Sequence, residues 1–510
     1  MILFKKDILQ NIIVYFFCGI IFSFSYEPYS LPYMQILSLV IIGYIWNKKD
    51  ENFFISFFYG FFFALSNNLI TFSWIVNPFK VYSNYTDYFA YFSFFLLSVL
   101  LSFLVGFAFS FSSFFGKKKN KAIKLIFLSI FIVFSELLKS TYFLNFPWSP
   151  ISSAWIDTPI IKNISFFGPY WLSFLLILSF FMISLFNFFS IFGIFLISSL
   201  IIFGQTFNKK EENNFINDIS LRLIQPNIKQ SEKWKLEKKD IFLNKLIFMS
   251  SSKKLPDLII WPETSVQFFP EINHKDLKKI SKNLETNLFF GARRISSDQK
   301  KIFNSAFFIN KDGEILKFYD KFQLVPFGEY IPFGKILRIF SLIKSEIRFP
   351  LGFSQGKTEN IINVDGIPPF LTLICYESIF TNLVDNWIRS SKSVKPEWVI
   401  NITNDAWFGN FNGPHQHLVY TRMRAIEQGI PIIRVANTGF SAVINYNGDI
   451  LELLELNTEG IIDTYLPRNN RSTIYNKLGS NVFNLGLVIF MILTILILSK
   501  IDKINFFKED

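Results

Sequence analysis

Long apolar runs separated by short polar breaks fill the first 205 residues, and one more run follows near the end of the chain. We place these runs at 9–25, 32–47, 53–76, 88–115, 122–138, 165–187, 190–205 and 482–499. Each is about long enough to cross the hydrocarbon core of a bilayer as a helix. The pattern therefore predicts a membrane α-helical bundle of about eight spans. Asn187 and Ser190 are the only polar break between runs six and seven, and one fused span there would reverse the side on which the following region lies.

The segment from 207 to 480 has a different pattern, in which short β-rich runs alternate with longer stretches at helical spacing. The clearest strands are Leu221–Gln225, Leu258–Trp261, Leu371–Ile374 and Trp398–Ile402, and the clearest helices are Lys233–Ser250 and His417–Gly429. Asp312-Gly313 and Asn447-Gly448 stand between apolar strands and predict hairpin turns. We therefore expect one α/β domain, joined to the spans by the polar stretch 208–214.

Lysines in the short loops predict the orientation of the spans. With a cytoplasmic N-terminus, twelve lysines lie on the cytoplasmic side and three on the other. The twelve are Lys5, Lys6, Lys48, Lys49, Lys117, Lys118, Lys119, Lys121, Lys124, Lys500, Lys503 and Lys508, and the three are Lys80, Lys139 and Lys162. We expect an N-terminal membrane domain of seven spans over 1–206, an extracytoplasmic polar domain over 207–480, and a C-terminal span with a cytoplasmic tail over 481–510.

Composition supports this division. Hydrophobic residues make up 51% of the 510 residues and charged residues only 18%, with 67 Phe, whereas soluble domains carry about 25% charged residues. An ordinary soluble enzyme is therefore excluded. The net charge of +12 is concentrated beside the apolar runs, which favours membrane orientation over nucleic-acid binding. The two cysteines, Cys18 and Cys375, lie in an apolar run and in the polar region, so we expect no disulfide.

Three polar residues stand where predicted strands or turns end. Glu263 follows the strand that ends in Trp261-Pro262, and Cys375 follows another strand that looks buried. Lys321 lies between a hairpin and a loop rich in Pro and Gly. Taken singly, they have ordinary explanations as a surface acid, a small buried hydrophobe and a surface lysine. Side chains at the carboxyl ends of strands in open α/β sheets are nevertheless well placed to meet a ligand.

Two further groups of residues are open to more than one interpretation. His415 and His417 form a pair at a helix start, but with three histidines in the chain and no clustered thiols we expect packing or substrate contact rather than zinc. Arg422, Arg424 and Arg434 could meet a lipid phosphate or serve as ion-pair partners, and the sequence favours neither.

The order Glu, Lys, Cys resembles the nitrilase superfamily, and longer motifs resemble the apolipoprotein N-acyltransferase family over nearly the whole chain. These motifs are Gln230 to Trp234, Trp261-Pro262-Glu263, Lys321 with Leu324 to Glu329, Cys375-Tyr376-Glu377, Asn404 to Gly409, Phe146-Pro147-Trp148 and Ile156 to Pro159. One departure is Gln323, where the family pattern has His. The resemblance implies a nitrilase-like αββα sandwich joined to the membrane bundle.

Acyl transfer through a cysteine needs a nucleophile, a base for its proton and a positive donor for the oxyanion. Cys375, Glu263 and Lys321 match these three roles in turn, provided that burial or nearby acids raise the pKa of Glu263. The resemblance also implies supporting or substrate-binding roles for Trp234, Glu329, Tyr376 and Glu377, whose structural alternatives are core aromatics and a capping acid.

The resemblance further implies the substrates and the location. The acyl donor is expected to be a phospholipid, the intermediate a thioester, and the acceptor the α-amine of the N-terminal diacylglyceryl-cysteine of a lipoprotein. We expect a multi-pass protein of the bacterial inner membrane with its catalytic domain on the periplasmic side, and no cofactor, metal or nucleic acid. The alternatives are a membrane-tethered amidase that hydrolyses its thioester, and a transporter. Against the transporter, the spans contain almost no charge other than Glu136.

Overall fold

The computed structural model describes residues 6–81, 86–141, 144–206, 215–251, 254–326, 328–330, 352–357, 360–391, 394–469 and 473–500. The polar stretch 208–214 and the lysines at 5, 503 and 508 lie outside these ranges. The chain divides into two compact units. Unit 1 comprises Met1–Lys210, Phe411–Val419 and Thr473–Asp510, and unit 2 comprises Glu211–Asn410 and Tyr420–Ser472.

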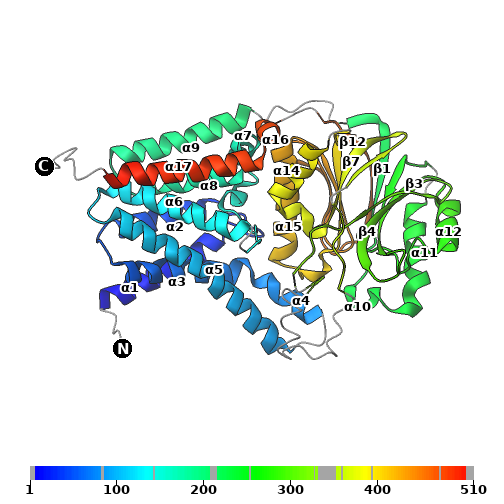
Figure 1. Cartoon of the computed structure of the whole chain (residues 1–510), viewed down its shortest axis with the longest axis horizontal. Helices are drawn as coiled ribbons and strands as arrows, with labels where there is room; N and C mark the ends of the chain where they lie inside the picture. Colours follow the sequence, from blue (N-terminus) through cyan, green and yellow to red (C-terminus); the bar gives the residue numbers. More distant parts are fainter. Residues whose placement is uncertain are drawn as a thin grey trace. The chain divides into compact units, whose positions relative to one another are not determined.

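Unit 1 is helical, and every predicted apolar run falls on a helix of it (Figure 1). The main helices are α1 (Lys6–Ser23), α2 (Tyr33–Trp46), α3 (Phe53–Thr71), α5 (Asp87–Gly116), α6 (Lys121–Ser140), α8 (Pro169–Ile183), α9 (Phe188–Thr206) and α17 (Ser480–Lys500). Short helices α4 (Val76–Val81), α7 (Ile164–Phe167) and α16 (Ile474–Leu478) complete it. Runs six and seven are separate, since α8 ends at Ile183 and α9 begins at Phe188.

Within the described ranges, five helices are long and apolar enough to cross a membrane, namely α1, α3, α5, α9 and α17. This is fewer than the eight or so spans that the apolar runs predict. Helices α2 and α8 are apolar but have only 14 and 15 residues. Helix α6 has 20 residues but carries Lys121, Lys124, Glu136 and Lys139.

Small residues let the helices of unit 1 approach closely. Gly19 of α1 faces the Phe63 carbonyl of α3 with no room for a Cβ atom, and Ser66 of α3 donates a hydrogen bond of 2.7 Å to the Phe16 carbonyl. Such contacts stabilise helix pairs where the hydrophobic effect between helices is weak. They explain why Gly and Ser interrupt the apolar runs.

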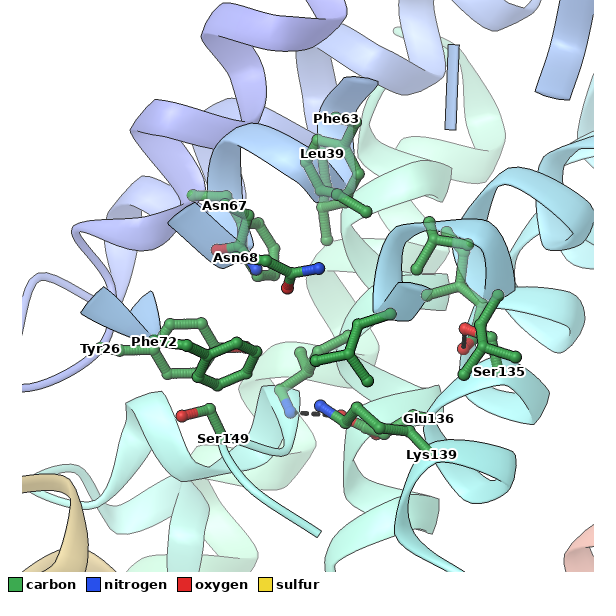
Figure 2. Close-up of a pocket in the computed structure, with 17 residues that line it drawn as sticks. Tyr26, Leu39, Phe63, Asn67, Asn68, Phe72, Ser135, Glu136, Lys139 and Ser149 are labelled. Carbon is green, nitrogen blue, oxygen red and sulfur yellow. Dashed lines mark hydrogen bonds between the residues drawn. The ribbon is translucent and has the colours of Figure 1, made fainter. Parts of the chain in front are cut away.

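Two charged residues of α6, Glu136 and Lys139, line a small cavity of about 70 Å³ in unit 1 (Figure 2). Glu136 accepts a hydrogen bond of 2.6 Å from the Ile151 amide, and Lys139 donates one of 2.8 Å to the Trp148 carbonyl. Asn67, Asn68 and Ser149 add polar groups to an otherwise mainly apolar wall. Glu136, the exceptional charge among the predicted spans, therefore helps to anchor the segment that contains the Phe146-Pro147-Trp148 motif.

Unit 2 contains two mixed six-stranded sheets. The first has the order β12 (Gly460–Pro467), β1 (Phe215–Gln225), β2 (Leu258–Ile260), β3 (Asn287–Ile295), β4 (Ile302–Ile309) and β5 (Ile315–Asp320). The second has the order β11 (Ile450–Leu454), β10 (Ser441–Ile444), β9 (Ile432–Ala436), β8 (Trp398–Thr403), β7 (Ile367–Ile374) and β6 (Ile361–Val364). Strands β1–β2–β3 and β7–β8–β9 are parallel, and the other pairs are antiparallel.

The two sheets pack face to face between helices. Phe289 of β3 and Phe308 of β4 contact Phe370 of β7, with ring centroids 5.3 and 6.4 Å apart. Helices α11 (Lys239–Ser250) and α12 (His274–Leu284) bury apolar side chains against the first sheet. Figure 1 shows α14 (Thr381–Ser390) and α15 (Asn412–Gln428) on the other side of the sheets. The α/β prediction is thus confirmed.

Both predicted hairpin turns are present. Gly313 lies between β4 and β5 with φ of 81°, and Gly448 lies between β10 and β11 with φ of 77°. These left-handed values favour glycine. The predicted helix over Lys233–Ser250 is wrong in its first turn, because α10 (Gln230–Lys233) ends there and α11 begins only at Lys239.

Candidate active site

Glu263 lies three residues beyond the short central strand β2. The neighbouring strand holds its main chain in place, since Gly291 of β3 donates a hydrogen bond of 3.1 Å to the Pro262 carbonyl and accepts one of 2.8 Å from the Ser265 amide. A Cβ atom at Gly291 would lie 2.6 Å from the Glu263 Cα. The close approach therefore requires glycine at this position of the strand, and it turns the Glu263 side chain into the interior, where it is 5% exposed.

Lys321 follows β5 directly and is almost completely buried. Its amide donates a hydrogen bond of 2.8 Å to the Asn304 carbonyl of β4. Its Nζ lies 3.0 Å from Glu329 Oε1 and 3.7 Å from Glu263 Oε1. The structure thus brings Lys321 together with two of the predicted site acids.

Cys375 follows β7, in the second sheet, and its own backbone is strained. Its φ of 52° is unusual for a residue with a side chain, and strain of this kind concentrates at functional sites. The thiol is buried, and like Cys18 it forms no disulfide. Its electrostatic neighbours include Glu263 and Lys321, so all three members of the predicted trio share one buried region of unit 2.

Glu377 connects the cysteine turn to the lysine segment. Its Oε2 accepts a hydrogen bond of 2.8 Å from the Ile374 amide. Its Oε1 accepts three more, from the Tyr319 hydroxyl and from the amides of Phe322 and Gln323, at 2.7 to 3.1 Å. Gln323, the departure from the family motif, thus contributes its main chain to this contact.

Asn304 was missed by the sequence analysis. Its Nδ2 donates hydrogen bonds of 2.7 Å to Glu263 Oε1 and 2.9 Å to Glu329 Oε1. Glu329 also accepts from the Val325 amide through Oε2. A buried asparagine within the apolar strand 302–309 was the available signal, because a polar side chain inside such a strand needs hydrogen-bond partners.

Burial and charge set the protonation of the trio. Burial raises the pKa of Glu263; the charge of Lys321 opposes this effect and that of Glu329 adds to it. Burial acts to lower the pKa of Lys321, but Glu329 and Glu263 outweigh it, so the pKa is raised. Burial, with the charge of Glu263, also raises the pKa of the Cys375 thiol. The resting site therefore favours a protonated thiol, a cationic lysine and a carboxyl that holds a proton more tightly than an ordinary glutamate does.

The predicted aromatic residues lie in different surroundings. Tyr376 is 6% exposed and packs edge-on against Phe380, with ring centroids 5.0 Å apart. Trp234 is 40% exposed, and the guanidinium of Arg293 lies 4.5 Å from its ring centroid. Lys233, just before it, is buried and donates a hydrogen bond of 3.1 Å to the Glu263 carbonyl. Burial lowers the pKa of Lys233 to about 8.

The Asn404 to Gly409 motif supports the same region. Asn404 donates a hydrogen bond of 2.8 Å to the Gln230 side chain at the start of α10. Asp405 forms an ion pair of 2.6 Å with Arg434 in which both side chains are fully buried. The family motifs around Gln230 and Asn404 are therefore parts of one hydrogen-bonded structure.

The other candidates have structural partners. Arg424 forms an ion pair of 2.6 Å with Glu427, and Arg422 donates a hydrogen bond of 2.9 Å to the Gly448 carbonyl. For Arg424 and Arg434 the ion-pair alternative thus fits the structure. His417 belongs to unit 1 and is buried there, with its ring centroid 6.1 Å from that of Trp148 of the same unit.

Comparison with known proteins identifies the family of the chain. Residues 18–182 match the apolipoprotein N-acyltransferase N-terminal domain, and residues 220–474 match the carbon-nitrogen hydrolase family. The apolipoprotein N-acyltransferase of Rickettsia prowazekii is 32% identical over 504 residues, covering 95% of each chain. That of Rhodopseudomonas palustris is 31% identical over 388 residues, covering 70% of each.

Among solved structures, an amidase from Nesterenkonia sp. is similar over 54% of this chain and 99% of its own, with 16% identity and a TM-score of 0.38. The family assignment rests instead on the two sequence relatives, which extend over both units. Unit 2 has a nitrilase-like carbon-nitrogen hydrolase fold with mixed sheets. The chain belongs to the apolipoprotein N-acyltransferase family.

Proposed function

We propose that this protein transfers an acyl chain from a phospholipid, through a thioester on Cys375, to the α-amine of the N-terminal diacylglyceryl-cysteine of lipoproteins. The observation that carries this proposal is the buried contact of Lys321 with Glu263 and Glu329, in the region that also contains the strained Cys375. It provides a base and an oxyanion donor beside a nucleophile, in a protein of the N-acyltransferase family.

In the first half-reaction the Cys375 sulfur attacks the ester carbonyl carbon, while Glu263 takes the thiol proton. The Lys321 ammonium stabilises the negative oxygen of the tetrahedral intermediate. The bond from carbon to the glycerol oxygen then breaks, and Glu263 returns its proton to that oxygen. The products are a lysophospholipid and the thioester.

In the second half-reaction the α-amine attacks the thioester carbonyl and Glu263 accepts a proton from the nitrogen. The carbon–sulfur bond breaks, and the proton passes to the departing sulfur. An amide and the free thiol result, so the enzyme returns to its starting state.

The other predicted residues have supporting roles in this proposal. Glu329 holds Lys321 and shares Asn304 with Glu263. Glu377 fixes the main chain on both sides of the site. Trp234 and Tyr376 supply aromatic surface for the lipid chains and help to exclude water.

For the membrane part we propose eight spans, with α2, α6 and α8 added to the five longest helices. The excess of lysines in the loops on one side supports a cytoplasmic N-terminus. On this topology, 1–206 is a membrane domain, 207–480 is a catalytic domain on the periplasmic side of the bacterial inner membrane, and 481–510 is a last span with a cytoplasmic tail. Water as acceptor is the alternative, and it is not favoured because the relatives across the chain are named N-acyltransferases.

Mass spectrometry of the purified protein tests the proposal. After incubation with a phospholipid of known chains, the intact mass should increase by one acyl group, and peptide mapping should place that group on Cys375. Hydroxylamine should remove it, as expected for a thioester. C375A should carry no adduct, and an acyl group found elsewhere in the wild-type protein would contradict the proposal.

A further inference from the structure

Arg293 of β3 lies in unusual surroundings. Its guanidinium lies close to two aromatic rings, 4.5 Å from the centroid of Trp234 and 5.1 Å from that of Phe269. Its Nε is buried without a hydrogen-bond partner, and the side chain forms no ion pair with any described residue. The next residue shows the contrast, because Arg294 forms two hydrogen bonds of 2.7 Å with Asp320.

Among the described residues, Arg293 therefore has no acidic ion-pair partner. Aromatic faces attract a guanidinium but accept none of its five N–H groups in the manner of an oxygen. Burial lowers the pKa of Arg293, and no acid contributes to the shift. A partly desolvated charge whose Nε has no acceptor is costly, so the placement of Arg293 beside two aromatic rings favours an anion supplied by a ligand.

The position of Arg293 connects it to the reaction. It is paired directly with Asn304 on the antiparallel strand β4, and such pairs project from the same face of a sheet with Cβ atoms about 5 Å apart. Asn304 in turn donates its hydrogen bond of 2.7 Å to the proposed base, Glu263. An anion bound by Arg293 would therefore be separated from Glu263 by about the length of the Asn304 side chain.

We propose that Arg293, which lies beside Trp234 and Phe269, binds the phosphate of the phospholipid acyl donor. This inference rests on the proposed function and names the group by which the donor is recognised. A planar guanidinium fork matches two phosphate oxygens. In a glycerophospholipid the phosphate is separated from the scissile ester by the glycerol unit alone, so anchoring the phosphate also orients the ester toward Cys375.

The test compares two acyl donors that differ in the phosphate. Full-length wild-type protein and R293Q, R293K and K300Q variants are assayed in detergent micelles with a diacyl phospholipid and with an uncharged p-nitrophenyl acyl ester. K300Q is the matched control, because it removes one exposed positive charge from the same hairpin. We expect R293Q to raise KM for the phospholipid about tenfold or more and to leave KM for the uncharged ester unchanged. R293K should lie between wild type and R293Q, and K300Q should match wild type.

Competition then identifies the source of the phosphate. A water-soluble glycerophosphodiester should inhibit the wild type and lose that effect in R293Q. If inorganic phosphate inhibits through Arg293 while KM for the phospholipid is unchanged in R293Q, the site binds free phosphate and the inference is wrong. Equal losses on both esters would show that Arg293 only supports the fold, and a change confined to KM for the acceptor peptide would assign the anion to the acceptor. Absence of lysophospholipid release by the wild type would instead overturn the proposed function.

Discussion

Lys321 Nζ lies closer to Glu329 than to Glu263, at 3.0 Å against 3.7 Å. The lysine is therefore held chiefly by an acid with no assigned part in proton transfer. Burial raises the pKa of Glu263 above its ordinary range, and the charge of Lys321 offsets this rise only in part. A base and an oxyanion donor can then coexist in contact without forming a tight, inert ion pair.

The first prediction follows from this division. The negative charge of Glu329 raises the pKa of Glu263, and E329Q removes that charge. The same substitution also removes one of the acidic partners of Lys321. The pKa of Glu263 should fall. Since a general base must be deprotonated, the acidic limb of the pH–rate profile should move to lower pH, while the maximal rate falls because the base is weaker.

The measurement is the pH dependence of kcat/KM for lysophospholipid release. E314Q, which alters an exposed acid on the β4–β5 hairpin, should have the wild-type profile. An acidic limb that stays in place in E329Q would show that Glu329 does not influence the base.

The second prediction concerns the oxyanion. K321M keeps much of the side-chain length and removes the charge, so turnover should fall about 10²-fold or more if Lys321 stabilises the tetrahedral intermediate. Intact-mass analysis should show the Cys375 adduct forming correspondingly slowly. Near-normal acylation in K321M would contradict the assignment, and a circular dichroism spectrum equal to that of wild type would show that the fold is retained.

A third prediction concerns Asn304, whose amide donates to both acids. N304L should remove both hydrogen bonds and leave two buried carboxylates short of donors, at a cost of about 1–3 kcal/mol for each group. We expect a lower melting temperature and a lower rate. N304D should be the more damaging to catalysis, since a third carboxylate opposes ionisation of Glu263. Equal rates in N304D and wild type would exclude this role.

The candidate site residues that could be predicted from the sequence lie just after β-strands. Glu263, Lys321 and Cys375 follow strands whose apolar runs are visible in the sequence, and the edge of a sheet is a known place for ligands. Asn304 was missed because it lies inside a strand, and the two acids it contacts, Glu263 and Glu329, lie elsewhere in the sequence.

The membrane unit shows a similar limit. The apolar runs located its helices, yet length and composition select only five spans among the helices that the structure describes. Helix α6 carries Glu136 and Lys139, whose hydrogen bonds to main-chain groups of residues 148–151 are tertiary contacts that a hydropathy pattern does not contain. The surroundings of Arg293 could not be predicted for the same reason, because Trp234 and Phe269 come from other parts of the sequence.

A fourth prediction tests the orientation. In a C18S background, a cysteine placed at Lys300 should react in intact spheroplasts with a label that cannot cross the membrane, while one placed at Lys117 should react only after permeabilisation. The lysine excess predicts that residue 117 lies on the cytoplasmic side, and both positions are exposed. The buried Cys375 serves as an internal control for background labelling. The opposite labelling pattern would refute the periplasmic assignment.

The last prediction separates acyl transfer to an amine from hydrolysis. An enzyme that waits for a second lipid substrate must protect its thioester from water, and here the nucleophile, the base and the cation are all buried, with exposures of 5%, 5% and 1%. With phospholipid alone, the protein should therefore release about one equivalent of lysophospholipid and stop, as expected for ping-pong kinetics.

Adding a diacylglyceryl-cysteine peptide with a free α-amine should discharge the acyl group as an amide, whereas the same peptide acetylated at that amine should not. Both products can be followed by mass spectrometry in one time course. Continuous release of fatty acid without the peptide would mean that water reaches the thioester freely, and the protein would then act as a hydrolase.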